Sequence, residues 1–160
     1  IGIYYEKEKL DYGMLNRLAK ELDDGHRENL VCQEGGWGPW VNCGGWLKIG
    51  GCSVDLILRD WDRVMEAVRE TDRGEFSAHY QTGHPHAFLN VAYRGELAAC
   101  RVLYSRDSEF EEQKQYAQQY PGAYSERVNR MFEVLGGEPL RGISMLKELC
   151  GQVQALCEEL

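Results

Sequence analysis

The chain has 160 residues, of which 43% are hydrophobic and 28% charged, and its formal net charge is −8. This length is enough to bury one sizeable core, and the aromatic and aliphatic content excludes a disordered segment. The negative charge disfavours proteins that grip the phosphate backbone of nucleic acid non-specifically. It does not exclude a single nucleotide ligand, because local basic residues and magnesium can hold one triphosphate.

The cysteine pattern and the apolar runs predict a soluble cytoplasmic domain. Six cysteines are present without a CxxC pair, and no secretory leader precedes them. No apolar run approaches the roughly 20 residues that span a bilayer. The chain opens with Ile1 rather than Met, so we expect the natural N-terminus to lie upstream.

The N-terminal part of the chain predicts a strand followed by a helix. Residues 1–5 are apolar, aromatic and β-branched, and a charged turn follows them. Leucine and methionine side chains then recur at helical spacing from Leu10 to Leu22. Asp23-Asp24-Gly25 is expected to end this helix, with the glycine as the stop.

A β-hairpin is predicted next, with arms at residues 41–49 and 52–58 joined by two glycines. Apolar and other side chains alternate in the second arm, which places Asp55 on the opposite face from Val54 and Leu56. Asp60 is expected to cap a helix that closes near residues 73–74.

The rest of the chain predicts short strands followed by helices. Residues 76–80 and 97–104 read as strands, and residues 88–93 read as a helical segment. A turn of glycine, histidine and proline is expected at residues 82–86. Three helices are expected at residues 109–119, 125–135 and 140–160.

Asp55 is the most informative candidate for chemistry. An unpaired carboxylate in a core costs several kcal/mol, so it must reach solvent, a partner or a metal. Enzymes of phosphoryl and nucleotidyl transfer use carboxylates held on strands to gather magnesium around a triphosphate. The alternative is an edge-strand aspartate that faces water.

Several segments together resemble the nucleotidyltransferase domain of the DNA polymerase beta type. Gly44-Gly45-Trp46-Leu47-Lys48-Ile49, followed by Val54-Asp55-Leu56-Ile57-Leu58-Arg59-Asp60, is similar to the strand with the third carboxylate of that family. Gly83-His84-Pro85-His86, and Gly95-Glu96 followed by Cys100-Arg101, add to the match. Residues 1–5 resemble the stretch immediately after the family's Asp-x-Asp pair.

The resemblance implies an α+β fold in which a mixed β-sheet bears Asp55 and is flanked by helices. Residues 1–106 would form the nucleotidyltransferase domain without its first strand and helix, and residues 107–160 a helical C-terminal segment. The implied activity is transfer of a nucleoside monophosphate from a nucleoside triphosphate to an acceptor hydroxyl. Asp55 would help to hold Mg²⁺ and would orient the acceptor proton. The family's Gly-Ser turn and Asp-x-Asp pair are expected upstream of Ile1, which would leave the printed chain catalytically incomplete.

Five further residues are candidates for substrate binding, each with a structural alternative. His84 and His86 flank Pro85 and can ligate a metal or steady a triphosphate oxygen, or serve only a rigid turn. Arg59 can grip phosphate with two parallel donors, or pair with a nearby carboxylate such as Asp60. Trp37 and Trp40 lie in a glycine-rich loop and can stack on an acceptor or base, or simply pack over the sheet.

Two rival functions belong to other classes. The first is a non-catalytic binding module of the same fold, such as an antitoxin-like partner or a scaffold. The second is an unrelated α+β interaction domain in which Asp55 is a solvated edge residue. An intact Gly-Ser and Asp-x-Asp motif upstream would distinguish the enzyme from the first rival, and magnesium-dependent nucleotide binding would distinguish it from the second.

Overall fold

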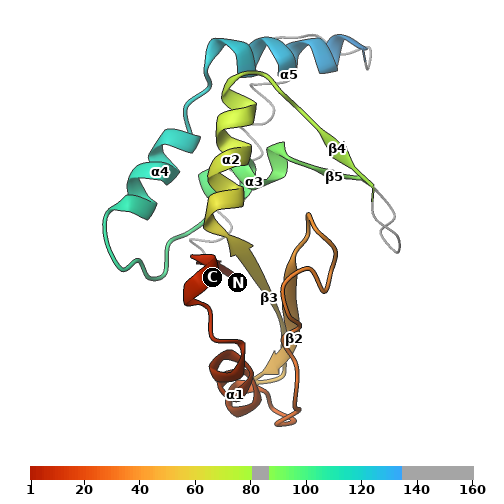
Figure 1. The fold of residues 1–160 in the computed structure, drawn as a ribbon, viewed down its shortest axis with the longest axis vertical. Coiled ribbons are helices and arrows are strands. Elements are labelled where there is room, and N and C mark those ends of the chain that lie inside the picture. Colours follow the sequence, from red (N-terminus) through yellow and green to blue (C-terminus); the bar gives the residue numbers. More distant parts are fainter. Residues whose placement is uncertain (81–86, 135–160) are drawn as a thin grey trace. The chain divides into compact units, whose positions relative to one another are not determined.

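A computed structural model describes residues 1–80 and 87–134 of the chain (Figure 1). Helices and strands are both present, so the expected α+β class is confirmed. The elements in chain order are β1 (Gly2–Tyr5), the short 3-10 helix η1 (Lys7–Lys9), α1 (Tyr12–Leu22), β2 (Cys43–Ile49), β3 (Cys52–Asp60), α2 (Trp61–Asp72), β4 (Ala78–His79), β5 (Phe88–Leu89), α3 (Val91–Ala99), α4 (Glu109–Ala117) and α5 (Gly122–Val134).

The larger sheet is mixed and has β3 at its centre. Its strand order is β1-β3-β2, with β1 parallel and β2 antiparallel to β3. In this register Gly2 pairs with Ile57, and Trp46 pairs with Asp55. A second, two-stranded sheet is formed by β4 and β5.

Turns and caps explain where the elements of the larger sheet and its helices begin. Gly50 and Gly51 join β2 to β3 with φ angles of 57° and 80°, and a two-residue hairpin turn with positive φ at both positions favours glycine. The Asp11 side chain accepts from the backbone of Met14 at the start of α1, and Asp60 accepts from Asp62 at the start of α2. The predicted cap at Asp60 is therefore confirmed.

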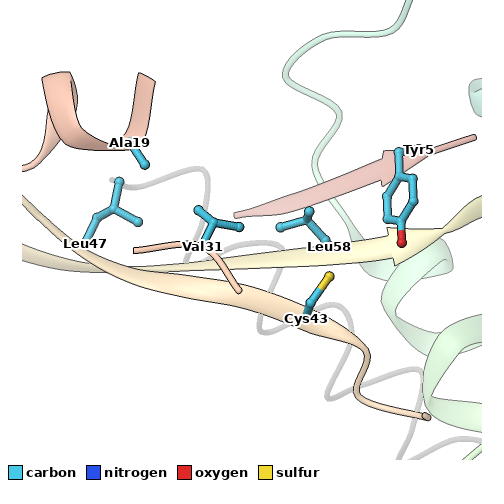
Figure 2. Packing of buried hydrophobic residues seen from close by; sticks show 6 residues of the cluster. All are labelled: Tyr5, Ala19, Val31, Cys43, Leu47 and Leu58. Carbon is cyan, nitrogen blue, oxygen red and sulfur yellow. The ribbon is translucent and has the colours of Figure 1, made fainter. Parts of the chain in front are cut away.

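One face of the sheet forms the hydrophobic core with α1 (Figure 2). Leu58 and Cys43 are completely buried there, and Leu47 packs with Ala19 of α1 and with Val31. Tyr5 closes the same cluster, and its hydroxyl accepts a 2.9 Å hydrogen bond from Asn42. Burial of this aliphatic surface supplies the main driving force for the hairpin to meet the helix.

A separate core forms among the later helices around the buried guanidinium of Arg94. Its Nη1 donates to an Asp72 oxygen at 2.6 Å, and its Nη2 donates to the Gln119 carbonyl at 2.8 Å. The guanidinium also lies 4.9 Å from the centre of the Tyr124 ring. A buried charge requires such a set of partners, so Arg94 organises the packing of these helices.

The strand predicted for residues 97–104 is wrong. Helix α3 continues to Ala99, and Cys100 ends it in an extended conformation. Leu97 and Tyr93, one helical turn apart, are both buried, whereas Leu103 and Tyr104 are 75% and 85% exposed. The apolar run therefore contains a helix end and an exposed loop, and its short length hid the helical period. The helical start expected at residue 88 also moves, because Phe88 and Leu89 form β5.

Contacts divide the chain into two compact units. The first comprises Ile1–Met65 and His79–Phe88, and the second comprises Glu66–Ala78 and the chain from Leu89 onward. The boundary expected at residue 107 falls within the second unit. Helices α4 and α5 confirm the helical character of the segment that follows it, and the helix expected at 140–160 lies outside the described residues. Among residues 1–80 and 87–134, no helix has both the length and the apolar character needed to cross a membrane.

Candidate active site

The two faces of the larger sheet differ in character, because side chains alternate along each strand. We call the side of β3 that bears Asp55 and Arg59 the Asp55 face, and the side that bears Leu56 and Leu58 the Leu58 face. The Leu58 face lines the hydrophobic core. The Asp55 face carries the candidate site.

Asp55 lies near the middle of β3 with an exposed side chain. Its partner across the antiparallel ladder is Trp46 of β2, and such cross-strand neighbours have Cβ atoms about 4.5–5.5 Å apart on the same face. On its other side, the Asp55 carbonyl accepts a 2.6 Å hydrogen bond from the Ile1 nitrogen. Asp55 thus has an exposed indole as its neighbour on β2, and its backbone is bonded on the other side to Ile1, the residue before β1.

Trp37 packs on the Asp55 face against Trp46, the cross-strand partner of Asp55. Its ring stacks on that of Trp46, with centroids 4.8 Å apart and an interplanar angle of 25°. The stack requires glycine at position 44, because a β-carbon there would lie 2.5 Å from the Trp37 ring. The structure therefore places Trp37 on the same face as Asp55 and connects the two through Trp46, which stacks on Trp37 and pairs with Asp55. The sequence did not single out Trp46 as a site residue.

A hydrogen-bonded loop holds Trp37 in this position. The Trp37 nitrogen donates to the Asn42 carbonyl at 2.8 Å, and the Asn42 side chain accepts from the Gly35 nitrogen at 3.1 Å. Asn42 also donates to the Leu58 carbonyl at 3.2 Å. Since Asn42 is buried, these contacts fix the loop to the end of β3.

Arg59 and Trp40 each make aromatic contacts away from the Trp37–Trp46 stack. Arg59 shares the Asp55 face, four residues and about 13 Å along the strand. It is buried, donates to the Val41 carbonyl at 2.7 Å and lies 5.7 Å from the centre of the Phe88 ring. These contacts give Arg59 a structural role, and its binding of phosphate stays a prediction.

The Trp40 ring contacts two other side chains, His79 and Arg63. Its ring stacks on that of His79, with centroids 3.5 Å apart. The guanidinium of Arg63 lies 4.5 Å from the centre of the Trp40 ring. This arrangement favours the packing alternative for Trp40 over an open stacking surface. The candidate residues His84 and His86 lie outside the described residues.

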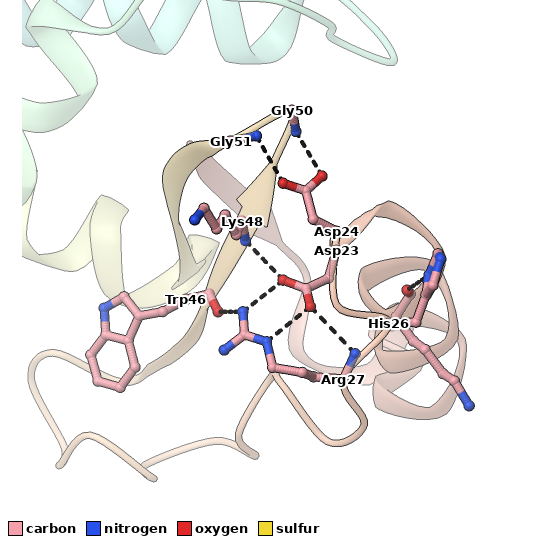
Figure 3. A network of polar contacts seen from close by, with 9 residues as sticks. Asp23, Asp24, His26, Arg27, Trp46, Lys48, Gly50 and Gly51 are labelled. Carbon is pink, nitrogen blue, oxygen red and sulfur yellow. Dashed lines mark hydrogen bonds and ion pairs between the residues drawn. The ribbon is translucent and has the colours of Figure 1, made fainter.

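A polar network anchors the strand that carries Trp46 (Figure 3). The buried Asp23 carboxylate accepts from the Lys48 nitrogen at 2.8 Å and from Arg27 Nη2 at 2.6 Å. The same Arg27 nitrogen donates to the Trp46 carbonyl at 3.1 Å. Arg27, with the Lys48 amide, holds the pKa of Asp23 well below its usual range. The network ties the end of α1 to β2 and keeps Trp46 in register opposite Asp55.

Asp24, next to this network, forms hydrogen bonds with the hairpin turn. Its two oxygens accept from the Gly51 and Gly50 nitrogens, each at 2.8 Å. The hydrogen bonds from Gly51 and Gly50 lower the pKa of Asp24. The pair Asp23-Asp24, expected only to end α1, therefore organises the hairpin.

The described residues offer Asp55 as a single candidate metal ligand. No group of three or more His, Cys, Asp or Glu side chains within residues 1–80 and 87–134 is arranged to hold a metal ion. One carboxylate is still a sufficient protein contribution where substrate phosphates and water complete the coordination of Mg²⁺. Asp55 fits that part, because its side chain is exposed and held on a strand.

Comparisons with known proteins identify no family for this chain. No protein-family model matches the chain, and no curated protein or solved structure matches it significantly.

Proposed function

We propose that this protein is a nucleotidyltransferase that transfers a nucleoside monophosphate from a nucleoside triphosphate to an acceptor hydroxyl. The proposal begins from the resemblance of the Gly44–Ile49 and Val54–Asp60 segments to the family's third-carboxylate strand. Asp55 would be that carboxylate. The fold would then be the nucleotidyltransferase form of the α+β class.

The parallel pairing of β1 with β3 is the observation that carries this proposal. Gly2 pairs with Ile57, so a residue two positions before Gly2 would pair with Asp55 if β1 continued in register. In the family, the Asp-x-Asp pair immediately precedes the segment that residues 1–5 resemble. The register therefore supports a cluster of carboxylates on the two strands, as metal-assisted transfer requires.

Asp55 would act on the acceptor. Its carboxylate accepts the proton of the acceptor hydroxyl as that oxygen bonds to the α-phosphorus. The bond from the α-phosphorus to the bridging oxygen breaks at the same time, and pyrophosphate leaves. Bound Mg²⁺ would neutralise charge on the phosphates, with Asp55 as one ligand beside upstream carboxylates. Asp55 is the member of this set that the structure describes, and the activity is expected from a protein in which the other carboxylates accompany it.

The other candidate residues would serve the two substrates. His84, His86 and Arg59 are proposed to contact the triphosphate, because imidazole and guanidinium groups donate to phosphate oxygens. Trp37 is proposed to contact the acceptor, since it lies on the Asp55 face and stacks on Trp46, which pairs with Asp55. Trp40 shares its loop but is engaged with His79 and Arg63. A net charge of −8 favours a small-molecule acceptor over nucleic acid.

The test is transfer from α-labelled triphosphates by the full-length protein with Mg²⁺. We expect Asp55→Asn to reduce transfer by about a hundredfold or more, because an amide is a far weaker base and metal ligand. Asp62→Asn is the matched control, since Asp62 is an exposed aspartate on α2 rather than on the sheet. Equal transfer by Asp55→Asn and wild type would remove Asp55 from catalysis. Magnesium-dependent triphosphate binding without any transfer would favour the binding module instead.

A further inference from the structure

The Trp37–Trp46 stack has a feature that core packing does not explain. Trp46 is 62% exposed although it lies within a central segment of β2. One face of its ring is covered by Trp37, and its strand is fixed by the bond from Arg27 to its carbonyl. Ligand-binding sites commonly combine an exposed apolar surface with a few fixed polar groups, and Trp46 with its neighbour Asp55 has this combination.

We propose that the Trp37–Trp46 stack is the platform on which the acceptor lies, and that the acceptor is a carbohydrate ring carrying the reactive hydroxyl. This inference rests on the proposed function, because it assigns the second substrate of the same reaction. It adds Trp46 as a residue that selects the acceptor by its shape.

The chemistry of a sugar ring matches the two neighbouring side chains. A pyranose has an apolar face of C–H bonds, which packs on an indole, and a rim of hydroxyl groups at its edge. With the ring on Trp46, a rim hydroxyl is directed along the sheet toward Asp55, its neighbour across the ladder. An ionised carboxylate only accepts hydrogen bonds, and a sugar hydroxyl donates one.

Other classes of acceptor fit this surface less well. A serine or threonine hydroxyl in a peptide has no flat face to lie on an indole. A nucleic acid presents bases that stack, but its phosphates meet a chain whose net charge is −8. A neutral ring with hydroxyls at its edge uses the indole and the carboxylate together.

The transfer step is the one written for the proposed function, with the sugar oxygen as nucleophile. That oxygen forms the new bond to the α-phosphorus, and the bond to the bridging oxygen breaks to release pyrophosphate. The sugar proton passes to the Asp55 carboxylate. The products are a sugar joined to a nucleoside monophosphate and free pyrophosphate.

The experiment offers three acceptor classes to the full-length protein with Mg²⁺ and four α-labelled nucleoside triphosphates. The arms are a panel of methyl glycosides, a peptide containing serine, threonine and tyrosine, and a single-stranded RNA oligonucleotide. We expect label in the glycoside arm. Trp46→Ala should raise the KM for the glycoside about tenfold, as for loss of a ring stack, with the KM for the triphosphate unchanged.

Two further variants test whether the change in glycoside KM depends on a flat ring at position 46. Trp46→Phe retains a smaller flat ring and should recover part of the acceptor affinity. Tyr104→Ala removes another exposed aromatic side chain, 85% exposed in the second unit, and should change neither KM.

Each outcome bears on one of the two claims. Label confined to the peptide or the RNA arm, or an unchanged glycoside KM in Trp46→Ala, would overturn the sugar assignment and leave the proposed function intact. Absence of label from every arm would instead count against nucleotidyl transfer itself, and the acceptor inference would fall with it.

Discussion

The two faces of the β1-β3-β2 sheet are built by alternate residues of the same strands, yet they have opposite properties. On the Leu58 face, Leu58 and Cys43 have no exposed surface. On the Asp55 face, Trp46 is 62% exposed and Asp55 is also exposed. The hairpin therefore buries its apolar side chains on one face and leaves Asp55 and Trp46 exposed on the other, where Arg59 alone of the charged strand residues named above is buried.

The largest expected effect comes from removing packing on the Leu58 face. Leu58→Ala leaves a cavity in the centre of the core and should lower the free energy of unfolding by about 2–5 kcal/mol. Leu103→Ala is the matched control, because Leu103 is 75% exposed and its truncation should change stability by less than about 0.5 kcal/mol. Urea denaturation followed by circular dichroism measures both. If the two variants were equally stable, the assignment of the core to this face would fail.

A smaller effect is expected from the glycine that lets Trp37 lie on the Asp55 face. A β-carbon at Gly44 would lie 2.0 Å from the Leu56 carbonyl oxygen and 2.5 Å from the Trp37 ring. Gly44→Ala should therefore destabilise the protein by about 1–3 kcal/mol and alter the near-ultraviolet circular dichroism of the stacked indoles.

The same substitution at Gly95 provides the control with the opposite sign. Gly95 lies within α3, and a β-carbon there would have nothing within 4 Å. Gly95→Ala should stabilise the protein by about 0.5–1 kcal/mol, because alanine favours the helix. A loss of stability in both variants would mean that the lack of space for a β-carbon at Gly44 is not what distinguishes the two positions.

The smallest expected effect is the loss of stability at acid pH that follows from protonation of the aspartates that anchor β2 and the hairpin turn. Asp23 has a pKa lowered in the folded state by its bonds from Arg27 and the Lys48 amide. Its contribution to stability is therefore complete above the unfolded pKa of about 3.9 and is lost as the pH falls through the lower folded value. Wild type should lose stability below about pH 4, and Asp24, whose pKa is lowered by Gly51 and Gly50, should add to this loss.

Asp23→Asn separates this network from general acid denaturation. The variant should melt several degrees lower than wild type at pH 7, yet lose less on acidification from pH 5 to pH 3. Asp62→Asn, which changes an exposed aspartate of α2, is the control for the loss of one acidic side chain. Parallel melting curves for wild type and Asp23→Asn across this pH range would contradict the role assigned to the carboxylate.

Local signals predicted the elements near the site well. The alternation in residues 52–58, the paired glycines at 50–51 and the capping side chain of Asp60 all lie within a few residues of what they determine. The strand predicted at 97–104 failed because Leu97 belongs to a helix whose buried partner, Tyr93, precedes the apolar run. A short apolar segment does not reveal its period by itself.

Trp46 shows why part of the candidate site was not predicted. Its alternation in the first arm of the hairpin and the turn at Gly50-Gly51 together determine that it pairs with Asp55. However, the stack with Trp37 depends on a loop whose path is set by Asn42 and by the space at Gly44. Those contacts join residues that no local periodicity relates.

The sequence by itself determined the α+β class, the hairpin and the position of Asp55 on the face opposite Leu56, because strand alternation and turn chemistry are local properties. Only the tertiary structure decided that β1 runs parallel to β3, that Asp23 anchors β2, and that Trp37 covers one side of Trp46. These arrangements depend on which distant segments lose water together and which buried polar groups find partners, and no single stretch of chain contains both members of such a pair.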